Sequence, residues 1–209
     1  MRPRDAVYST LKRRILLNEL KPETGLTELG VAQELGCSQG TVREALLRLQ
    51  EDGLVLRNGH RGTMVTPLEA DEAEEMLALR RRLETRGAMR AAARCQRDDV
   101  TRLQALLADM EEAARAGDDY GLIEIDTAFH MAIFRIAGLR SLDQILQRCI
   151  LHSHRQKLWE PRHQRPLVET ARRHQPLIAA LDKGGESLAQ ALGHHIDTIV
   201  AIAPERLAV

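Results

Sequence analysis

The sequence predicts a mainly α protein, in which an N-terminal winged helix-turn-helix is followed by an all-α six-helix antiparallel bundle. Two observations predict this fold. Residues 27–66 hold two short helical patterns and then two strand-like segments around an Asn-Gly turn. Beyond Pro67 only helical periods recur, with no strand signal and no internal repeat. We therefore expect two domains, residues 1–67 and residues 68–209.

The composition is that of an ordinary soluble protein, with 44% hydrophobic and 29% charged residues. Aromatic residues make up only 2%, so the core must be built from aliphatic side chains. No apolar run approaches the ~20 residues that cross a bilayer, and no signal peptide is evident. Three scattered cysteines without a C-x-x-C motif indicate reduced thiols. We expect a cytoplasmic protein without membrane contact.

Local signals define the N-terminal elements. Val7, Leu11 and Ile15 recur at four-residue steps and predict a helix over residues 4–18. Thr27 can cap a second helix, which Gly36 would end. A third helix would begin after the capping residue Ser38 and run to about residue 51. Residues 54–57 and 63–66 flank the Asn-Gly turn and read as a hairpin.

Two helices joined by a Gly-containing turn and followed by a hairpin can place the second helix in a DNA major groove. Residues 1–67 hold ten Lys or Arg and eight Asp or Glu. Because this excess is small, affinity for DNA would depend on a few placed arginines and on pairing of two chains. The candidate DNA contacts are Ser38, Gln39, Thr41, Arg43, Arg48, His60 and Arg61.

The candidates would contact different parts of the DNA. Amides near Ser38 suit a phosphate, and Arg43 can reach a guanine edge. Arg48 would meet a phosphate, while His60 and Arg61 at the hairpin tip would enter a minor groove or touch the backbone. For any single arginine, a solvated surface position is an equal alternative.

The segment Thr41-Val42-Arg43-Glu44-Ala45-Leu46-Leu47-Arg48-Leu49, with Gly53-Leu54-Val55, resembles the N-terminal domain of GntR-family bacterial transcription regulators. Leu26-Thr27-Glu28 and Arg61-Gly62-Thr63 also match that domain. The resemblance covers nearly all of residues 4–67 and implies double-stranded operator DNA as a partner. Where the family commonly carries Arg-Thr-Pro after the serine, this chain has Gln39-Gly40-Thr41. The missing arginine leaves the operator sequence open.

The second part shows helical periods separated by Gly, Pro or Asp breaks. Asp126 and His130 are four residues apart and so share one helix face. His174 and His195 fall on apolar stripes, whereas His194 lies on a polar side. One inward Asp and three inward His suit Zn, Ni, Mn or Fe, although inward histidines are often hydrogen-bonded core residues. The expected helices are 71–94, 99–115, 118–138, 141–158, 166–183 and 187–202.

The segments Asp126-Thr127-Ala128-Phe129-His130, Arg173-His174 and His195-Ile196 resemble the metal-bearing segments of the FCD ligand-binding domain. That domain accompanies the GntR reader in the FadR-type subfamily, and six helices would indicate its VanR-like branch. The resemblance implies Asp126, His130, His174 and His195 as ligands of a divalent metal, with Zn as the first choice. Arg173 replaces a glutamate that is frequent there, and Gly184-Gly185 replaces a frequent Gly-Asp pair. Neither change removes a ligand.

The segment Arg80-Arg81-Arg82-Leu83-Glu84 resembles the R-x-x-L-E motif of the same family. Arg80 and Glu84 are therefore candidate effector-binding residues, with Arg80 clamping a carboxylate beside the metal. The alternative is an internal Arg80–Glu84 ion pair that fixes the helix. His152 and His154 either line the same cavity or are polar residues near a helix end.

These observations predict a DNA-binding transcription regulator that works as a homodimer. We expect it to be a repressor. A divalent metal and a small organic acid would bind the helical domain and modulate operator binding. One alternative is a metal-dependent hydrolase or lyase, against which stand the lack of an H-E-x-x-H motif and of an evident general base. A second alternative is a sensor of the metal itself.

Overall fold

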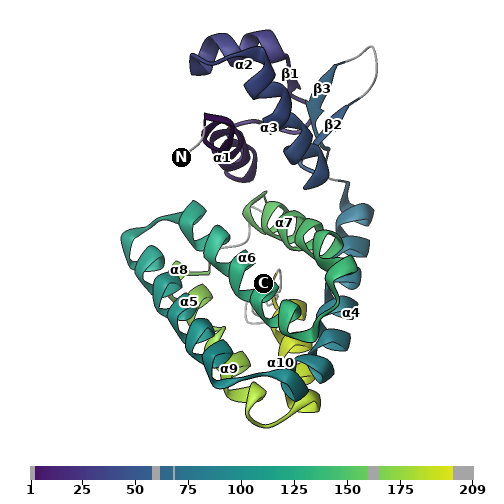
Figure 1. Cartoon of the computed structure of the whole chain (residues 1–209), viewed down its shortest axis with the longest axis vertical. Helices are drawn as coiled ribbons and strands as arrows, with labels where there is room; N and C mark the ends of the chain where they lie inside the picture. The colour runs from purple at the N-terminus through teal and green to yellow at the C-terminus, as the bar shows by residue number, and fades with distance from the viewer. Residues whose placement is uncertain (1–2, 58–61, 68, 160–164, 200–209) are drawn as a thin grey trace, which may run out of the picture. The chain divides into compact units, whose positions relative to one another are not determined.

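The computed structural model describes residues 3–57, 62–67, 69–159 and 165–199 (Figure 1). The chain divides into two compact units, Met1–Glu72 and Ala73–Val209. None of the helices in the described ranges combines the length and the apolarity needed to cross a membrane.

The N-terminal unit contains three helices, α1 (Pro3–Leu16), α2 (Glu28–Leu35) and α3 (Gln39–Glu51). The predicted caps are confirmed. Thr27 Oγ1 accepts a hydrogen bond from the Gly30 amide at 3.0 Å, and Ser38 Oγ accepts one from the Thr41 amide at 3.1 Å. Gly36 ends α2 with a φ of 64°, a left-handed conformation that favours glycine. These caps fix the tight turn between α2 and α3.

Three short strands complete this unit: β1 (Gly25–Leu26), β2 (Val55–Arg57) and β3 (Thr63–Val65). The sheet order is β1-β3-β2 with antiparallel pairing, so the predicted hairpin is confirmed. The Asn58-Gly59 turn lies outside the described residues. The sequence did not predict β1, because two residues are too few to show a strand alternation. The core of the unit consists of fully buried aliphatic side chains: Leu11, Ile15, Leu16, Val42, Ala45, Leu46, Leu49, Leu54, Val55 and Val65.

Among its described residues the C-terminal unit contains helices and no strands, which confirms the mainly α class. The bounds are α4 (Ala70–Arg94), α5 (Arg97–Ala116), α6 (Asp119–Ala137), the 3-10 helix η2 (Arg140–Leu142), α7 (Asp143–Trp159), α8 (Leu167–Arg172), α9 (Gln175–Leu181) and α10 (Gly185–Asp197). Helix α5 packs along α6 and α8, α6 lies beside α7, and α9 contacts α10 (Figure 1).

The helix predicted over residues 166–183 is in fact two helices, α8 and α9, which meet at His174. Pro176 explains the break, because its ring has no amide hydrogen and clashes with the carbonyl of the residue four positions earlier, Arg172. The described C-terminal residues thus form seven α-helices. The predicted count of six, which favoured the VanR-like branch, was wrong.

A glycine brings two helices of the bundle together. A Cβ on Gly87 of α4 would lie 3.0 Å from Cδ2 of Phe134 on α6, closer than carbon atoms normally approach. Gly87 follows Glu84 by one turn, so this close approach places the Glu84 carboxylate beside α6. Aliphatic side chains and Phe129 fill the surrounding core, which includes Ala88, Ala91, Leu103, Met110, Ile133, Leu177, Leu188 and Leu192.

Candidate metal centre

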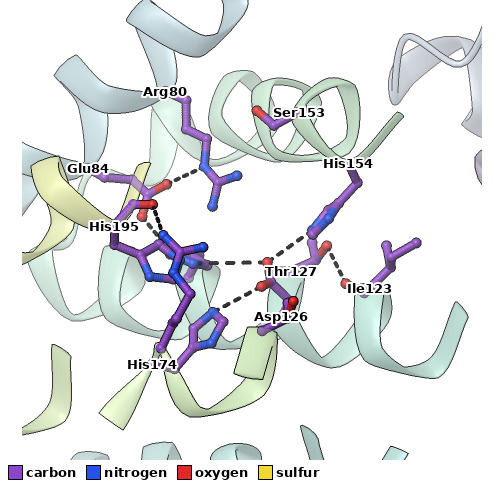
Figure 2. Close-up of polar contacts among 12 residues, drawn as sticks. Arg80, Glu84, Ile123, Asp126, Thr127, Ser153, His154, His174 and His195 are labelled. Atoms are coloured by element: carbon purple, nitrogen blue, oxygen red, sulfur yellow. Dashed lines mark hydrogen bonds and ion pairs between the residues drawn. The ribbon is translucent and has the colours of Figure 1, made fainter. Parts of the chain in front are cut away.

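The four predicted ligand residues converge in the C-terminal unit. Asp126 and His130 come from α6. His174 stands at the start of α9, and His195 comes from α10 (Figure 2). Each offers one ligand atom, and these atoms all lie within 4.8 Å of one another. All four side chains are buried. His194 is exposed, as its polar stripe predicted.

His174 turns one fixed ring nitrogen toward Asp126. Nδ1 of His174 lies 3.0 Å from the Ala171 carbonyl oxygen, which can only accept, so Nδ1 carries the hydrogen. Nε2 therefore faces Asp126 and lies 2.9 Å from its Oδ1. In a neutral ring this Nε2 holds a lone pair, and a cation bound by both atoms would compensate the two electron-rich groups.

His130 shows the same arrangement with a different outer partner. Its Nδ1 lies 2.5 Å from Oε2 of Glu84, and that carboxylate accepts the hydrogen. Nε2 of His130 is buried without a hydrogen-bond partner among the described residues and lies 4.0 Å from Asp126 Oδ2. A histidine that donates one nitrogen to a carboxylate presents the other to a metal in a fixed orientation.

His195 completes the imidazole group. Its ring centroid lies 4.6 Å from that of His174 and 5.0 Å from that of His130. Burial, together with the neighbouring His174 and His130, holds the pKa of His195 well below its usual range. The ring is therefore neutral near pH 7, which is the form that binds a metal. Its Nδ1 is buried and has no hydrogen-bond partner in the described chain.

Asp126 lies between imidazoles from different helices. Nε2 of His154, on α7, approaches Asp126 Oδ2 at 3.0 Å (Figure 2). Burial by itself would raise the pKa of Asp126, but His154 and His174 hold it well below the usual value. From its sequence position, His154 could either line the cavity or be a polar residue near a helix end. The four-residue steps from Leu146 through Ile150 to His154 were the signal that places it inward.

Arg80 and Glu84 form the internal ion pair that was one of the two alternatives for them. Nε of Arg80 donates to Glu84 Oε1 at 2.7 Å, with both side chains almost completely buried. Burial would raise the pKa of Glu84, but His130 and Arg80 lower it to about 2. Both terminal nitrogens of Arg80 are buried without a hydrogen-bond partner among the described residues. The ion pair therefore leaves two donors for another anion.

The donor set fits a divalent transition metal. Three imidazoles and one carboxylate are typical of Zn²⁺ and related ions, and an outer carboxylate on a ligand histidine is a recurring second layer around such ions. Four buried atoms with unused lone pairs would be expensive to bury without an ion, since such groups normally find a partner. The site can hold a cation and an anion beside it.

In the N-terminal unit, Arg43 extends from the exposed side of α3 and pairs with Glu28 on α2. Its Nη2 lies 2.6 Å from Glu28 Oε2, and its Nε lies 3.0 Å from Oε1. Arg57 of β2 also donates to Glu28, at 3.1 Å. The Arg43 side chain is 58% exposed, so it remains open to an approaching partner.

The other predicted DNA contacts fall into three groups. Arg48 faces α1, where Nη1 lies 2.7 Å from Asp5 Oδ1 and the guanidinium stacks over the Tyr8 ring at 3.9 Å. Ser38, Gln39 and Thr41 lie at the start of α3, and the two hydroxyl groups are 2.9 Å apart. His60 and Arg61 lie outside the described residues.

Comparison with known protein families identifies both units. The model of the bacterial regulatory proteins of the gntR family matches residues 3–65, and the FCD domain model matches residues 75–198. The chain belongs to the GntR family of regulators with an FCD domain. Membership places it among transcriptional regulators rather than enzymes, so the hydrolase or lyase alternative is set aside.

Individual proteins agree with this assignment. A probable D-xylose utilization operon transcriptional repressor of Paenarthrobacter nicotinovorans is 31% identical over 176 residues, covering 81% of this chain and 74% of that protein. The HTH-type transcriptional repressor RspR of Escherichia coli (strain K12) is 25% identical over 194 residues, covering 92% and 85%. The structure of E. coli McbR/YncC covers 95% of both chains with a TM-score of 0.77 and 24% identity. This last likeness supports the GntR-type fold.

Proposed function

We propose that this GntR-family regulator represses transcription by binding operator DNA as a homodimer, and that its FCD domain binds a divalent metal and a small organic acid. Zn²⁺ is the first choice of metal, with Ni²⁺, Mn²⁺ or Fe²⁺ as alternatives. The names of two relatives support the repressor assignment, since both are named as transcriptional repressors. The metal and the acid rest on the geometry of the C-terminal unit.

One observation supports the proposal of a metal: Asp126, His130, His174 and His195 each turn a buried ligand atom to the same place, within 4.8 Å of one another. A bound divalent ion would pair with these atoms and supply a Lewis acid for carboxylate or hydroxyl oxygens of the acid. Glu84 fixes the orientation of His130, and Ala171 fixes that of His174. The terminal nitrogens of Arg80 would clamp the carboxylate, because a guanidinium matches its geometry.

We propose that α3 enters the major groove with its first turn against a phosphate and Arg43 at a base edge. The capped start of α3, at Ser38 and Thr41, leaves further backbone amides for that phosphate. Arg43 would exchange Glu28 for the DNA, which is feasible because the pair is exposed. Arg48 instead stabilises the contact between α1 and α3 through Asp5 and Tyr8.

The acid would regulate transcription by changing the mobility or the spacing of the two winged helix-turn-helix domains in the dimer. Such coupling requires that the acid bind the DNA-competent and DNA-incompetent states with different affinities. For the acid to release the protein from DNA, the DNA-incompetent state must bind the acid more tightly.

Operator binding under defined metal and acid conditions tests the proposal. An operator is first selected from a random duplex pool with the full-length protein. Mobility-shift titrations then compare chelated protein, Zn²⁺-loaded protein, and Zn²⁺-loaded protein with a panel of small carboxylates. We expect a carboxylate to weaken operator binding at least tenfold only when the metal is present. If Zn²⁺ alone causes the shift, the protein senses the metal itself; if neither does, the proposed regulation is wrong.

The ligand set has its own test. The double variant His174→Ala with His195→Ala should reduce bound metal from about one ion per chain to background, because two of four ligands are lost. Elemental analysis of the purified protein measures this. His194→Ala is the matched control, since that imidazole is exposed on the same helix and should leave occupancy unchanged. Full occupancy in the double variant would remove these histidines from the site.

A further inference from the structure

Two arginines meet at the end of α10, next to the candidate metal centre. Nη2 of Arg173 donates to the backbone carbonyl of His195 at 2.7 Å and to the Thr198 hydroxyl. Nη2 of Arg165 donates to the backbone carbonyl of Thr198 at 3.0 Å. Because both guanidinium groups bind Thr198, they lie side by side. Arg173 also contacts the backbone of His195, whose side chain is a proposed metal ligand.

Lys157, near the end of α7, adds a third cation to this group. Its ammonium has a long hydrogen bond of 3.5 Å to the Thr170 hydroxyl. Burial, together with the cations Arg165 and Arg173, lowers the pKa of Lys157 to about 8, while Asp126 acts in the opposite direction. Thr170 and Arg173 are three residues apart at the end of α8, so the contact with Thr170 places Lys157 near Arg173.

The described carboxylates compensate this group only in part. Asp126 acts on Lys157, but it also faces the imidazoles of His154 and His174. Glu169 is 63% exposed and lies 3.7 Å from Arg165 Nε, and the effect of Asp119 on Lys157 is smaller than that of either arginine. Nη1 of Arg165 is buried without a hydrogen-bond partner among the described residues. Three cations thus share a partly buried region with incomplete compensation, an arrangement that a bound anion would relieve.

Arg173 lies at the junction of α8 and α9, and its guanidinium shares Thr198 with that of Arg165. Its side chain is only partly buried, so an anion can reach it. Structural arginines that only cap a helix end do not need two further cations beside them.

We propose that Lys157, Arg165 and Arg173 form a second anion subsite beside the candidate metal centre, so that the effector carries two anionic groups. One group would bind at the metal and Arg80, and the other at this three-cation subsite. The effector class is therefore a small acid with a second carboxylate or with a phosphate. This inference rests on the proposed function, since it assigns the second end of the same ligand.

Matched pairs of acids on Zn²⁺-loaded, full-length protein test the inference by isothermal titration calorimetry. Lactate is compared with tartronate, malate and 2-hydroxyglutarate, which keep the 2-hydroxy acid head and place a second carboxylate at three spacings. Glycerate is compared with 3-phosphoglycerate, which adds a phosphate. We expect at least one dianion to bind tenfold or more tightly than its monoanionic partner. The arm that wins identifies the second group as carboxylate or phosphate.

Variants assign that advantage to the subsite. Lys157→Met and Arg165→Gln should each reduce it to less than about threefold while leaving the affinity for the monoanion unchanged. Arg172→Gln, an exposed arginine on α8, should retain it. If monoanion and dianion bind equally, the second subsite is wrong and the proposed function stands. If none of the acids binds, the proposed acid effector is wrong and the subsite falls with it.

Discussion

The two units hold their arginine–carboxylate pairs in opposite environments. In the N-terminal unit, Arg43 is 58% and Glu28 20% exposed, so water competes for both groups. In the C-terminal unit, Arg80 is 1% and Glu84 2% exposed, and the same carboxylate also binds His130. Exposed pairs contribute little to stability, whereas breaking a buried pair leaves an uncompensated charge.

This difference suits the two proposed functions. Arg43 can leave Glu28 for a base or phosphate, because water and salt screen the pair that it gives up. Arg80 cannot leave Glu84 without a large penalty, so it holds a fixed position and offers only its terminal nitrogens to a ligand. The proposed DNA contact is therefore exchangeable, and the proposed effector contact is preorganised.

The largest expected effect comes from neutralising the buried carboxylate. Glu84→Gln should lower the free energy of unfolding by ~3–5 kcal/mol, because Arg80 then keeps its charge in a buried site without a counter-charge. Urea denaturation of the metal-free full-length protein measures this change. Glu28→Gln is the matched control in the exposed pair and should shift the midpoint only slightly. Equal losses of unfolding free energy in the two variants would show that burial does not make the Arg80–Glu84 pair more important for stability than the Arg43–Glu28 pair.

The next effect concerns DNA. Arg43→Ala should weaken operator binding about 10- to 100-fold and relax base preference at one position, as expected for a lost arginine contact to a base edge. Mobility shifts on the selected operator and on single-base variants measure both quantities. Arg48→Ala should leave the base preference unchanged because this arginine contacts Asp5 and Tyr8. A uniform loss across all sequences would move Arg43 from the base edge to the backbone.

Much of this organisation could be predicted from local sequence signals. The caps of α2 and α3 depend on residues within three positions of each other, as in the Thr27–Gly30 and Ser38–Thr41 hydrogen bonds. The inward orientation of His174 and His195 follows from apolar neighbours on the same helix face. Such signals are local, because helix geometry alone relates the residues to one another.

Other features could not be predicted because they depend on contacts between distant segments. Glu28 and Arg43 lie 15 residues apart, and only the folded turn between α2 and α3 brings them together. The group of Lys157, Arg165 and Arg173 comes from the end of α7, the segment before α8 and the junction with α9. The break at Pro176 was a different case: proline chemistry signals it, but the apolar stripe through residues 167–181 concealed it.

The pH dependence of stability tests whether Lys157 is desolvated in the folded protein. The pKa of Lys157 is lowered to about 8 from a usual value of 10.5. Between these pH values the unfolded chain binds more protons than the folded one, so the contribution of Lys157 to the free energy of unfolding rises with pH. Denaturation at pH 7.5 and 9.5 should show a larger gain for wild type than for Lys157→Met. An equal gain in the two proteins would mean that Lys157 is not desolvated.

The smallest expected effect tests whether the exposed pair restrains DNA binding. Glu28→Gln removes a carboxylate that competes with DNA for Arg43 and Arg57 and that repels nearby phosphates. Operator affinity should therefore increase by up to about fivefold at low salt, the range expected for an exposed ion pair, and the gain should shrink as salt rises. Mobility shifts at two salt concentrations measure it. Weaker binding would instead show that Glu28 orients Arg43 for the base, and the exposed pair would then be as preorganised as the buried one.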